Sequence, residues 1–125
     1  MQVYIIPMLA DNLCYYITRD LATKPGILID VAEPVKLKKF MQANGITMPP
    51  TLLLTTHKHS DHSAGNRDMA KSFPGIHIIG GADDRIPAMT QACTHGQQFE
   101  VNDIRITCLH TPCHTRGSFT FVFEP

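Results

Sequence analysis

The segment Thr51-Leu-Leu-Leu-Thr-Thr-His-Lys-His-Ser-Asp-His62 joins an apolar run to a dense group of side chains that commonly bind metal ions. The Leu-rich part follows two prolines and predicts a buried strand over residues 51–55. The polar group comes directly after this strand and consists of His57, His59, Asp61 and His62. On extended backbone, side chains two residues apart project to the same side, so His57 and His59 can converge on one ion. Imidazole and carboxylate ligands suit zinc or iron. The segment therefore predicts a metal site at the end of a strand.

A second segment, Leu109-His-Thr-Pro-Cys-His-Thr115, places another histidine at the end of a predicted strand. Pro112 fixes its own φ and restricts Thr111, which holds the turn that presents His114. A third imidazole would complete a face of three histidines with His57 and His59. Three protein ligands leave one coordination position for water, as in a catalytic rather than a structural zinc site.

The remaining histidines and the cysteines are expected to have ordinary roles. His77 and His95 stand alone in the sequence, and His110 is expected to pack or to support the site from the strand. The four cysteines form no C-x-x-C pair and are interpreted as reduced thiols. Cys113 is expected to be a buried free thiol and not a ligand.

The pattern along the chain predicts one layered α/β domain over residues 1–125. Early strands are predicted at residues 3–6, 13–18 and 26–30, with a helix from Glu33-Pro34 to Asn44-Gly45. A second helix is predicted to end near Ser72 and a short one to span Asp84 to Met89, with a strand over residues 76–79 between them. Residues 99–101 and 104–109 suggest a hairpin that turns at Asn102-Asp103. The last strand, residues 118–123, carries Phe119, Phe121 and Phe123 on one face and would be an uncovered edge.

Composition limits the class of partner. Hydrophobic residues make up 43% of the 125 residues, so the chain can bury a core. Its formal net charge is zero, which argues against broad electrostatic binding to nucleic acid or to an anionic membrane. No apolar run is long enough to span a bilayer, and the N-terminus does not resemble a signal peptide. We therefore expect a cytoplasmic protein with a small-molecule partner. A mitochondrial form and the oligomeric state are left open.

The H-x-H-x-D-H motif after a hydrophobic strand resembles the signature of the metallo-β-lactamase superfamily. Further segments resemble successive landmarks of one of its families, glyoxalase II (hydroxyacylglutathione hydrolase), in the family's order. They are Asp11-Asn-Leu-Cys-Tyr-Tyr16, Leu54-Thr-Thr-His57, Asp61-His-Ser-Ala-Gly-Asn66, Gly80-Gly-Ala-Asp-Asp-Arg-Ile86 and Thr111-Pro-Cys-His-Thr115. The resemblance implies an αββα sandwich, of which residues 1–125 would be roughly the N-terminal half.

The same resemblance implies the roles of the site residues. His57, His59 and His114 match ligands of a first metal ion, while Asp61 and His62 match ligands of a second. The family's metal is usually zinc, with iron or manganese tolerated. The implied reaction is hydrolysis of S-D-lactoylglutathione, a glutathione thioester, to D-lactate and glutathione in methylglyoxal detoxification. Asp61 would also orient the attacking water, which makes it the residue nearest to a catalytic one.

The chain departs from the family pattern in three places. Ser60 stands where an aromatic residue is usual, and Ser118 stands where the family has a histidine, so Ser118 is given no metal role. The family continues with a metal-bridging Asp, another His ligand and a helical region that binds glutathione, all beyond Pro125. We therefore expect a truncated isoform or a fragment, with its glutathione-binding residues outside the chain. The alternatives are a persulfide dioxygenase of the same superfamily, which uses one iron, and a non-catalytic metal-binding fragment; residues 80–86 favour glyoxalase II over the dioxygenase.

Overall fold

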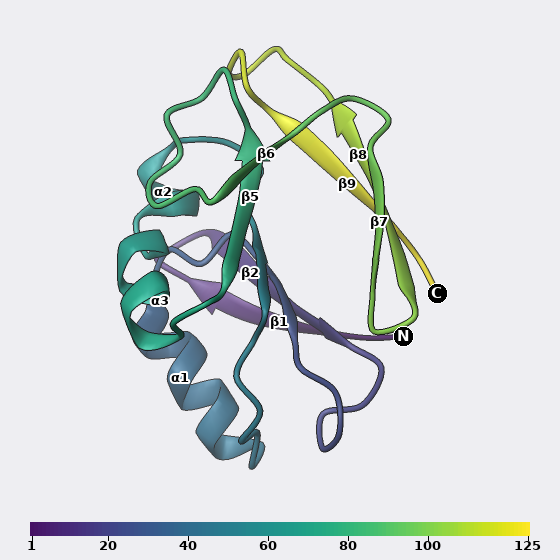
Figure 1. The fold of residues 1–125 in the computed structure, drawn as a ribbon. Helices are drawn as coiled ribbons and strands as arrows, with labels where there is room; N and C mark the ends of the chain where they lie inside the picture. The colour runs from purple at the N-terminus through teal and green to yellow at the C-terminus, as the bar shows by residue number, and fades with distance from the viewer.

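The computed structural model describes residues 1–125 as two sheets and three short helices (Figure 1). The first sheet has the strand order β1-β2-β3-β4-β5-β6, and the second has the order β7-β8-β9. The strands of the first sheet are β1 (Gln2–Met8), β2 (Asn12–Thr18), β3 (Ile27–Ile29), β4 (Leu52–Leu54), β5 (His77–Gly81) and β6 (Gln91–Cys93). Those of the second are β7 (Gln98–Val101), β8 (Ile104–His110) and β9 (Phe119–Glu124). The helices are α1 (Pro34–Ala43), α2 (Ser60–Ser63) and α3 (Asn66–Ser72).

The elements form three layers, with the helices on one face of the six-stranded sheet and the smaller sheet on the other (Figure 1). Strand β4 explains why both faces of this sheet are covered, because its three leucines are all buried and alternate between the two faces. Leu53 packs in the cluster that also holds Leu37 of α1 and Met69 of α3. Leu52 and Leu54 pack in the cluster between the sheets. This confirms the predicted layered α/β fold.

The central strands run in one direction and bring their carboxyl ends to one edge of the sheet. Strand β3 pairs with β4, and β4 with β5, in parallel. Parallel neighbours end at the same edge, so the residues that follow the three strands meet there. Asp30 follows β3, His57 follows β4 and Asp84 follows β5. This edge carries the candidate site.

One predicted helix is wrong and two short elements were not predicted. Residues 84–89 form turns and irregular backbone instead of a helix. Pro87 removes a helical donor and disfavours helical backbone at Ile86, and Ala88 has a positive φ of 55°. Strand β6 and the single turn α2 are too short to leave a periodic signal. The hairpin turn is confirmed, with φ of 53° at Asn102 and 61° at Asp103.

The last strand lies at the edge of its sheet, as predicted. Strand β9 pairs only with β8. Its three phenylalanines point into the layer between the sheets, where Phe119 is buried and Phe121 and Phe123 pack against the cluster. The exposed edge therefore presents backbone, and the outward face of the strand carries Thr120, Val122 and Glu124 and not the aromatic rings. None of the helices is long and apolar enough to cross a membrane.

Candidate metal site

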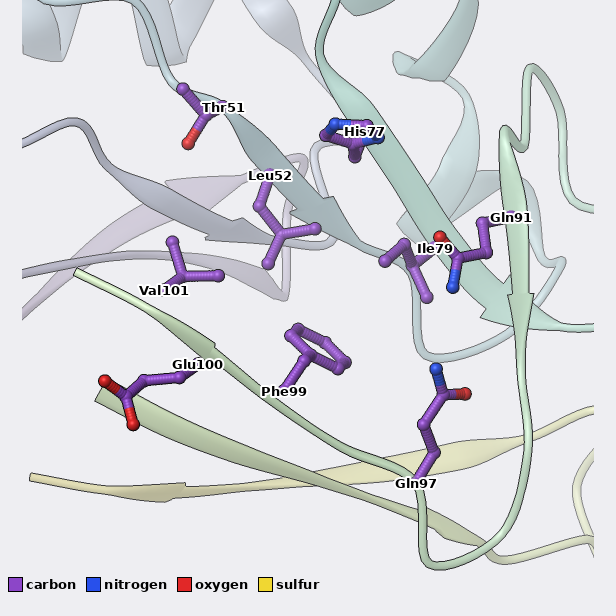
Figure 2. Close-up of a pocket in the computed structure, with 9 residues that line it drawn as sticks. All are labelled: Thr51, Leu52, His77, Ile79, Gln91, Gln97, Phe99, Glu100 and Val101. Atoms are coloured by element: carbon purple, nitrogen blue, oxygen red, sulfur yellow. The ribbon is translucent and has the colours of Figure 1, made fainter. Parts of the chain in front are cut away.

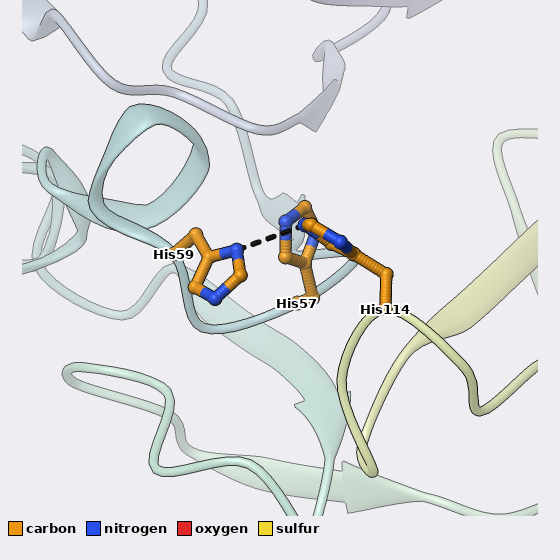
Figure 3. A group of neighbouring side chains, drawn as sticks. All are labelled: His57, His59 and His114. Carbon is orange, nitrogen blue, oxygen red and sulfur yellow. Dashed lines mark hydrogen bonds between the residues drawn. The ribbon is translucent and has the colours of Figure 1, made fainter.

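Three imidazoles from two separate loops converge at the edge of the molecule (Figure 3). His57 lies in the loop after β4, His59 caps the N-terminus of α2, and His114 lies in the loop between β8 and β9. One potential ligand atom from each ring lies within 4.8 Å of the others. The structure thus brings together the three residues that the sequence predicts for the first metal ion. Their role as ligands stays a prediction.

The hydrogen bonds around His57 leave one of its ring nitrogens ready to bind a cation. The Thr56 hydroxyl donates to Asp30 Oδ2 at 2.7 Å, so its oxygen accepts from His57 Nδ1 at 2.9 Å. His57 Nε2 then carries the lone pair. That atom is buried and has no hydrogen-bond partner. A buried polar atom without a partner is costly, and a metal ion would satisfy it.

Electrostatics favour the same state of His57. Burial lowers the pKa of His57 below its usual value, and positive charge on His62 would lower it further. A low pKa keeps the imidazole neutral, which is the form that binds metals.

The spacing of the other two rings also fits one ion. His59 Nδ1 and His114 Nε2 are 3.0 Å apart. Two ligand nitrogens on one tetrahedral zinc with ordinary bond lengths lie about 3.3 Å apart. These two nitrogens share a hydrogen bond, so one of them carries a proton that the ion would displace, and their separation is close to the spacing that zinc needs.

Asp61 and His62 lie beside the three imidazoles and face each other. His62 Nε2 is 3.5 Å from Asp61 Oδ2, and the rings of His57 and His62 have centroids 4.3 Å apart. Asn12 donates to Asp61 Oδ2 at 2.8 Å, which lowers the pKa of Asp61 and keeps it ionised. His62 Nδ1 donates to Asp30 Oδ2 at 2.8 Å, and this bond raises the pKa of His62. An ionised carboxylate and the Nε2 of His62 therefore lie next to the first site.

The sequence predicted none of the three supporting residues by role, namely Asn12, Asp30 and Asp84. Asp30 accepts from both Thr56 and His62, and Asp84 accepts from the backbone between His57 and His59. The available signal was position, because Asp30 and Asp84 follow strands next to the one that ends at the histidine motif. This positional signal indicates the site only once the three strands are known to pair in parallel.

The other histidines lie outside the cluster. His110 stacks on Phe119 with ring centroids 5.1 Å apart, and its Nε2 donates to the carbonyl of Arg116 at 2.8 Å. It therefore supports the loop that carries His114, in line with its predicted packing role. His95 accepts from the His110 backbone, and His77 is exposed at the start of β5.

Cys113 corrects one sequence prediction, because its side chain is exposed and not buried. Cys113 lies beside His114 in the loop between β8 and β9, and no helix or strand covers its side chain. The four cysteines are free thiols, as predicted, and the other three are buried. Burial raises the pKa of Cys14, next to the charge of Asp30, and that of Cys93, each to about 12.

These environments predict selective alkylation. In the native protein, iodoacetamide near neutral pH should label Cys113 and leave Cys14, Cys93 and Cys108 unlabelled, because the last three are buried away from the reagent and burial raises the pKa of their thiols. Peptide mass spectrometry before and after unfolding in urea measures this. Labelling of Cys93 at the rate of Cys113 in the folded protein would contradict it.

Two cavities differ in their relation to the cluster. A cavity of about 260 Å³ lies between the sheets at the amino ends of β4 and β5, lined by Leu52 and Ile79 on one side and Phe99 and Val101 on the other (Figure 2). The histidine cluster lies beyond the opposite end of β4. A polar cavity of about 310 Å³ adjoins His59 and His114. Only the second is placed to admit a ligand to the cluster.

This layered fold, with imidazoles from two sheets meeting at strand ends, defines a class of metal-binding α/β/β protein. Residues 10–122 match the model of the metallo-beta-lactamase superfamily, and the chain belongs to that superfamily. The chain is 37% identical over 97% of its length to a human hydroxyacylglutathione hydrolase-like protein and covers 40% of that relative.

Solved structures agree on the fold. The chain matches BJP-1, a subclass B3 metallo-β-lactamase of Bradyrhizobium japonicum, with a TM-score of 0.80 and 20% identity, over 97% of this chain and 53% of that one. It matches the di-zinc metallo-β-lactamase LRA-12 from a soil metagenome with a TM-score of 0.78 and 22% identity, again over 97% and 53%. The chain thus spans about half of each, which confirms the expected partial sandwich.

Proposed function

We propose that this chain forms the metal-binding part of a hydrolase that cleaves glutathione thioesters, with S-D-lactoylglutathione as its substrate and D-lactate and glutathione as products. The observation that carries the proposal is the buried, unpartnered Nε2 of His57 within a face of three imidazoles. The similarity to hydroxyacylglutathione hydrolase-like proteins supports the choice of substrate. The superfamily itself includes many hydrolases of other bonds, so the substrate rests on this second support.

We infer that the metal is zinc. The site offers nitrogen and carboxylate ligands without a thiolate, which zinc accepts readily. The di-zinc character of LRA-12 supports the same choice. Iron and manganese remain the alternatives that a metal analysis would detect.

The residues of the site would have separate roles in hydrolysis. His57, His59 and His114 would hold the ion, which supplies an acidified water and a Lewis acid for the thioester carbonyl. Asp61 is ionised and held by Asn12, so its free oxygen can accept a hydrogen bond from the attacking water and orient it. The polar cavity beside His59 and His114 would admit the acyl group.

A hydrolysis assay tests this function. The metal-free protein is loaded with zinc and mixed with S-D-lactoylglutathione, and loss of the thioester absorbance is followed. We expect zinc-dependent hydrolysis that a chelator stops and that His57→Ala lacks. Zinc binding without hydrolysis would overturn the enzymatic proposal for this chain and favour a non-catalytic metal-binding protein. Oxygen consumption by the iron-loaded protein with glutathione persulfide would instead favour the dioxygenase.

A further inference from the structure

Asp84 lies where the two loops that carry the imidazoles meet, although it touches none of the rings. Its side chain is buried, with the residue 3% exposed. One oxygen, Oδ2, accepts from the backbone N–H of Lys58 at 2.9 Å and from the Thr115 hydroxyl at 2.8 Å. The other oxygen accepts from the backbone N–H of Gly117 at 2.9 Å.

Two of these three donors are next to the histidines of the cluster in the sequence. Lys58 lies between His57 and His59, so its N–H belongs to the loop segment that carries both rings. Thr115 is the immediate neighbour of His114. The first loop follows a strand of the six-stranded sheet, and the second precedes a strand of the three-stranded sheet. One carboxylate therefore joins the two sheets at the point where their histidines face each other.

We propose that Asp84 is a positioning residue that sets the separation of His59 and His114 and so the affinity of the three-histidine face for a divalent cation. It acts through the backbone and hydroxyl donors of the two loops and not by ligation. The inference rests on the metal site of the proposed function.

The chemistry of the contacts suits this role. Burial by itself would raise the pKa of Asp84, but the hydrogen bonds from Thr115, Lys58 and Gly117 outweigh it and lower the pKa. The group is therefore ionised, and hydrogen bonds to a carboxylate are shorter and stronger than those between neutral groups. Asp84 offers acceptors only, and all three neighbours are donors.

Close packing makes the contact specific. A Cβ added to Gly117 would lie 2.4 Å from the Asp84 backbone nitrogen, so the His114 loop approaches the turn after β5 as only glycine allows. A backbone bond from the N–H of Phe119, the first residue of β9, to the carbonyl of Thr56, 2.9 Å long, also joins the two sheets. The sheets thus stay connected without Asp84, and loss of its carboxylate is expected to loosen the ligand face more than the fold.

Three variants test the role. Asp84→Asn replaces one acceptor oxygen by an N–H₂ donor, which then faces an N–H or O–H donor of the two loops. Thr115→Val removes one of the three bonds, together with the bond between the Thr115 and Ser118 hydroxyls, and leaves Asp84 intact, whereas Thr115→Ser keeps the hydroxyl. Asp103→Asn is the matched control, because Asp103 is exposed in the turn between β7 and β8, away from the cluster, and its side chain makes no hydrogen bond.

The measurement is the affinity of the purified protein for zinc, by competition with a coloured chelator, beside the urea stability of the metal-free protein. We expect about 10–100-fold weaker zinc binding for Asp84→Asn and Thr115→Val, as for other residues that orient ligands. Thr115→Ser and Asp103→Asn should bind as the parent does. The visible spectrum of the cobalt form should change in the first two variants only.

The outcomes separate this inference from the proposed function. A parent protein that binds no zinc would overturn the metal site itself. A parent that binds zinc, with Asp84→Asn folded and of unchanged zinc affinity and cobalt spectrum, would overturn the positioning role alone. If Asp84→Asn does not fold, Thr115→Val decides, and its unchanged zinc affinity would overturn the role equally.

Discussion

His57→Ala is expected to abolish tight zinc binding. The loss should exceed the roughly 10–100-fold that removal of a supporting residue costs, because His57 supplies the ligand atom itself. Its Nε2 is the buried nitrogen that has no partner within the protein, while its Nδ1 is engaged with Thr56. Competitive titration of the metal-free protein with zinc measures the effect, and zinc-dependent thioester hydrolysis should vanish with it.

The control for this prediction is His77→Ala. His77 is exposed at the far end of β5 from the cluster, so the same change of residue type should leave zinc affinity and stability near those of the parent. Circular dichroism checks that both variants keep the fold. A folded His57→Ala protein with the parent's zinc affinity would show that the three imidazoles do not form the binding face.

The sequence was sufficient for the parts of the site that lie in one segment or carry a strong local signal. His57 and His59 are two apart after an apolar strand, and His114 follows a proline at the end of another strand. The apolar runs and the hairpin at Asn102-Asp103 had equally local causes. These features could be predicted because burial patterns and turn-forming residues act over only a few residues.

The parts that the sequence did not predict depend on contacts between distant segments. Asp30 is 32 residues from His62, and Asp84 is 31 residues from Thr115. Apart from their positions after strands, the residues around these aspartates do not indicate which donors they bind. The mistaken helix over residues 84–89 has a local cause instead, because Pro87 disfavours helical backbone at Ile86 and Ala88 has a positive φ.

Asp30→Ala is expected to weaken both stability and metal binding. The Asp30 carboxylate accepts from the Thr56 backbone N–H at 2.8 Å, from the Thr56 hydroxyl and from His62. Leaving a buried donor without its partner costs about 1–3 kcal/mol. Asp30 also has a positive φ of 54°, which aspartate tolerates better than alanine, so backbone strain adds to the loss. We therefore expect urea denaturation of the metal-free protein to show a loss of about 1–3 kcal/mol from the missing acceptor, increased by this strain.

Asp30→Asn separates the two effects. Asparagine tolerates the positive φ and can still accept from the Thr56 N–H, so the loss of stability should be smaller than in Asp30→Ala. Its amide N–H₂, however, cannot accept from His62 Nδ1. His62 then keeps a proton on Nε2 instead, and the nitrogen that faces Asp61 can no longer bind a cation. The same N–H₂ group faces the Thr56 hydroxyl, so the arrangement that keeps the proton on His57 Nδ1 is lost as well. Titration with zinc should therefore show the binding of both ions weakened, each by about 10–100-fold, in Asp30→Asn. A variant that binds every ion as tightly as the parent would contradict this role, since the carboxylate would then fix the loop without setting the tautomer of His62.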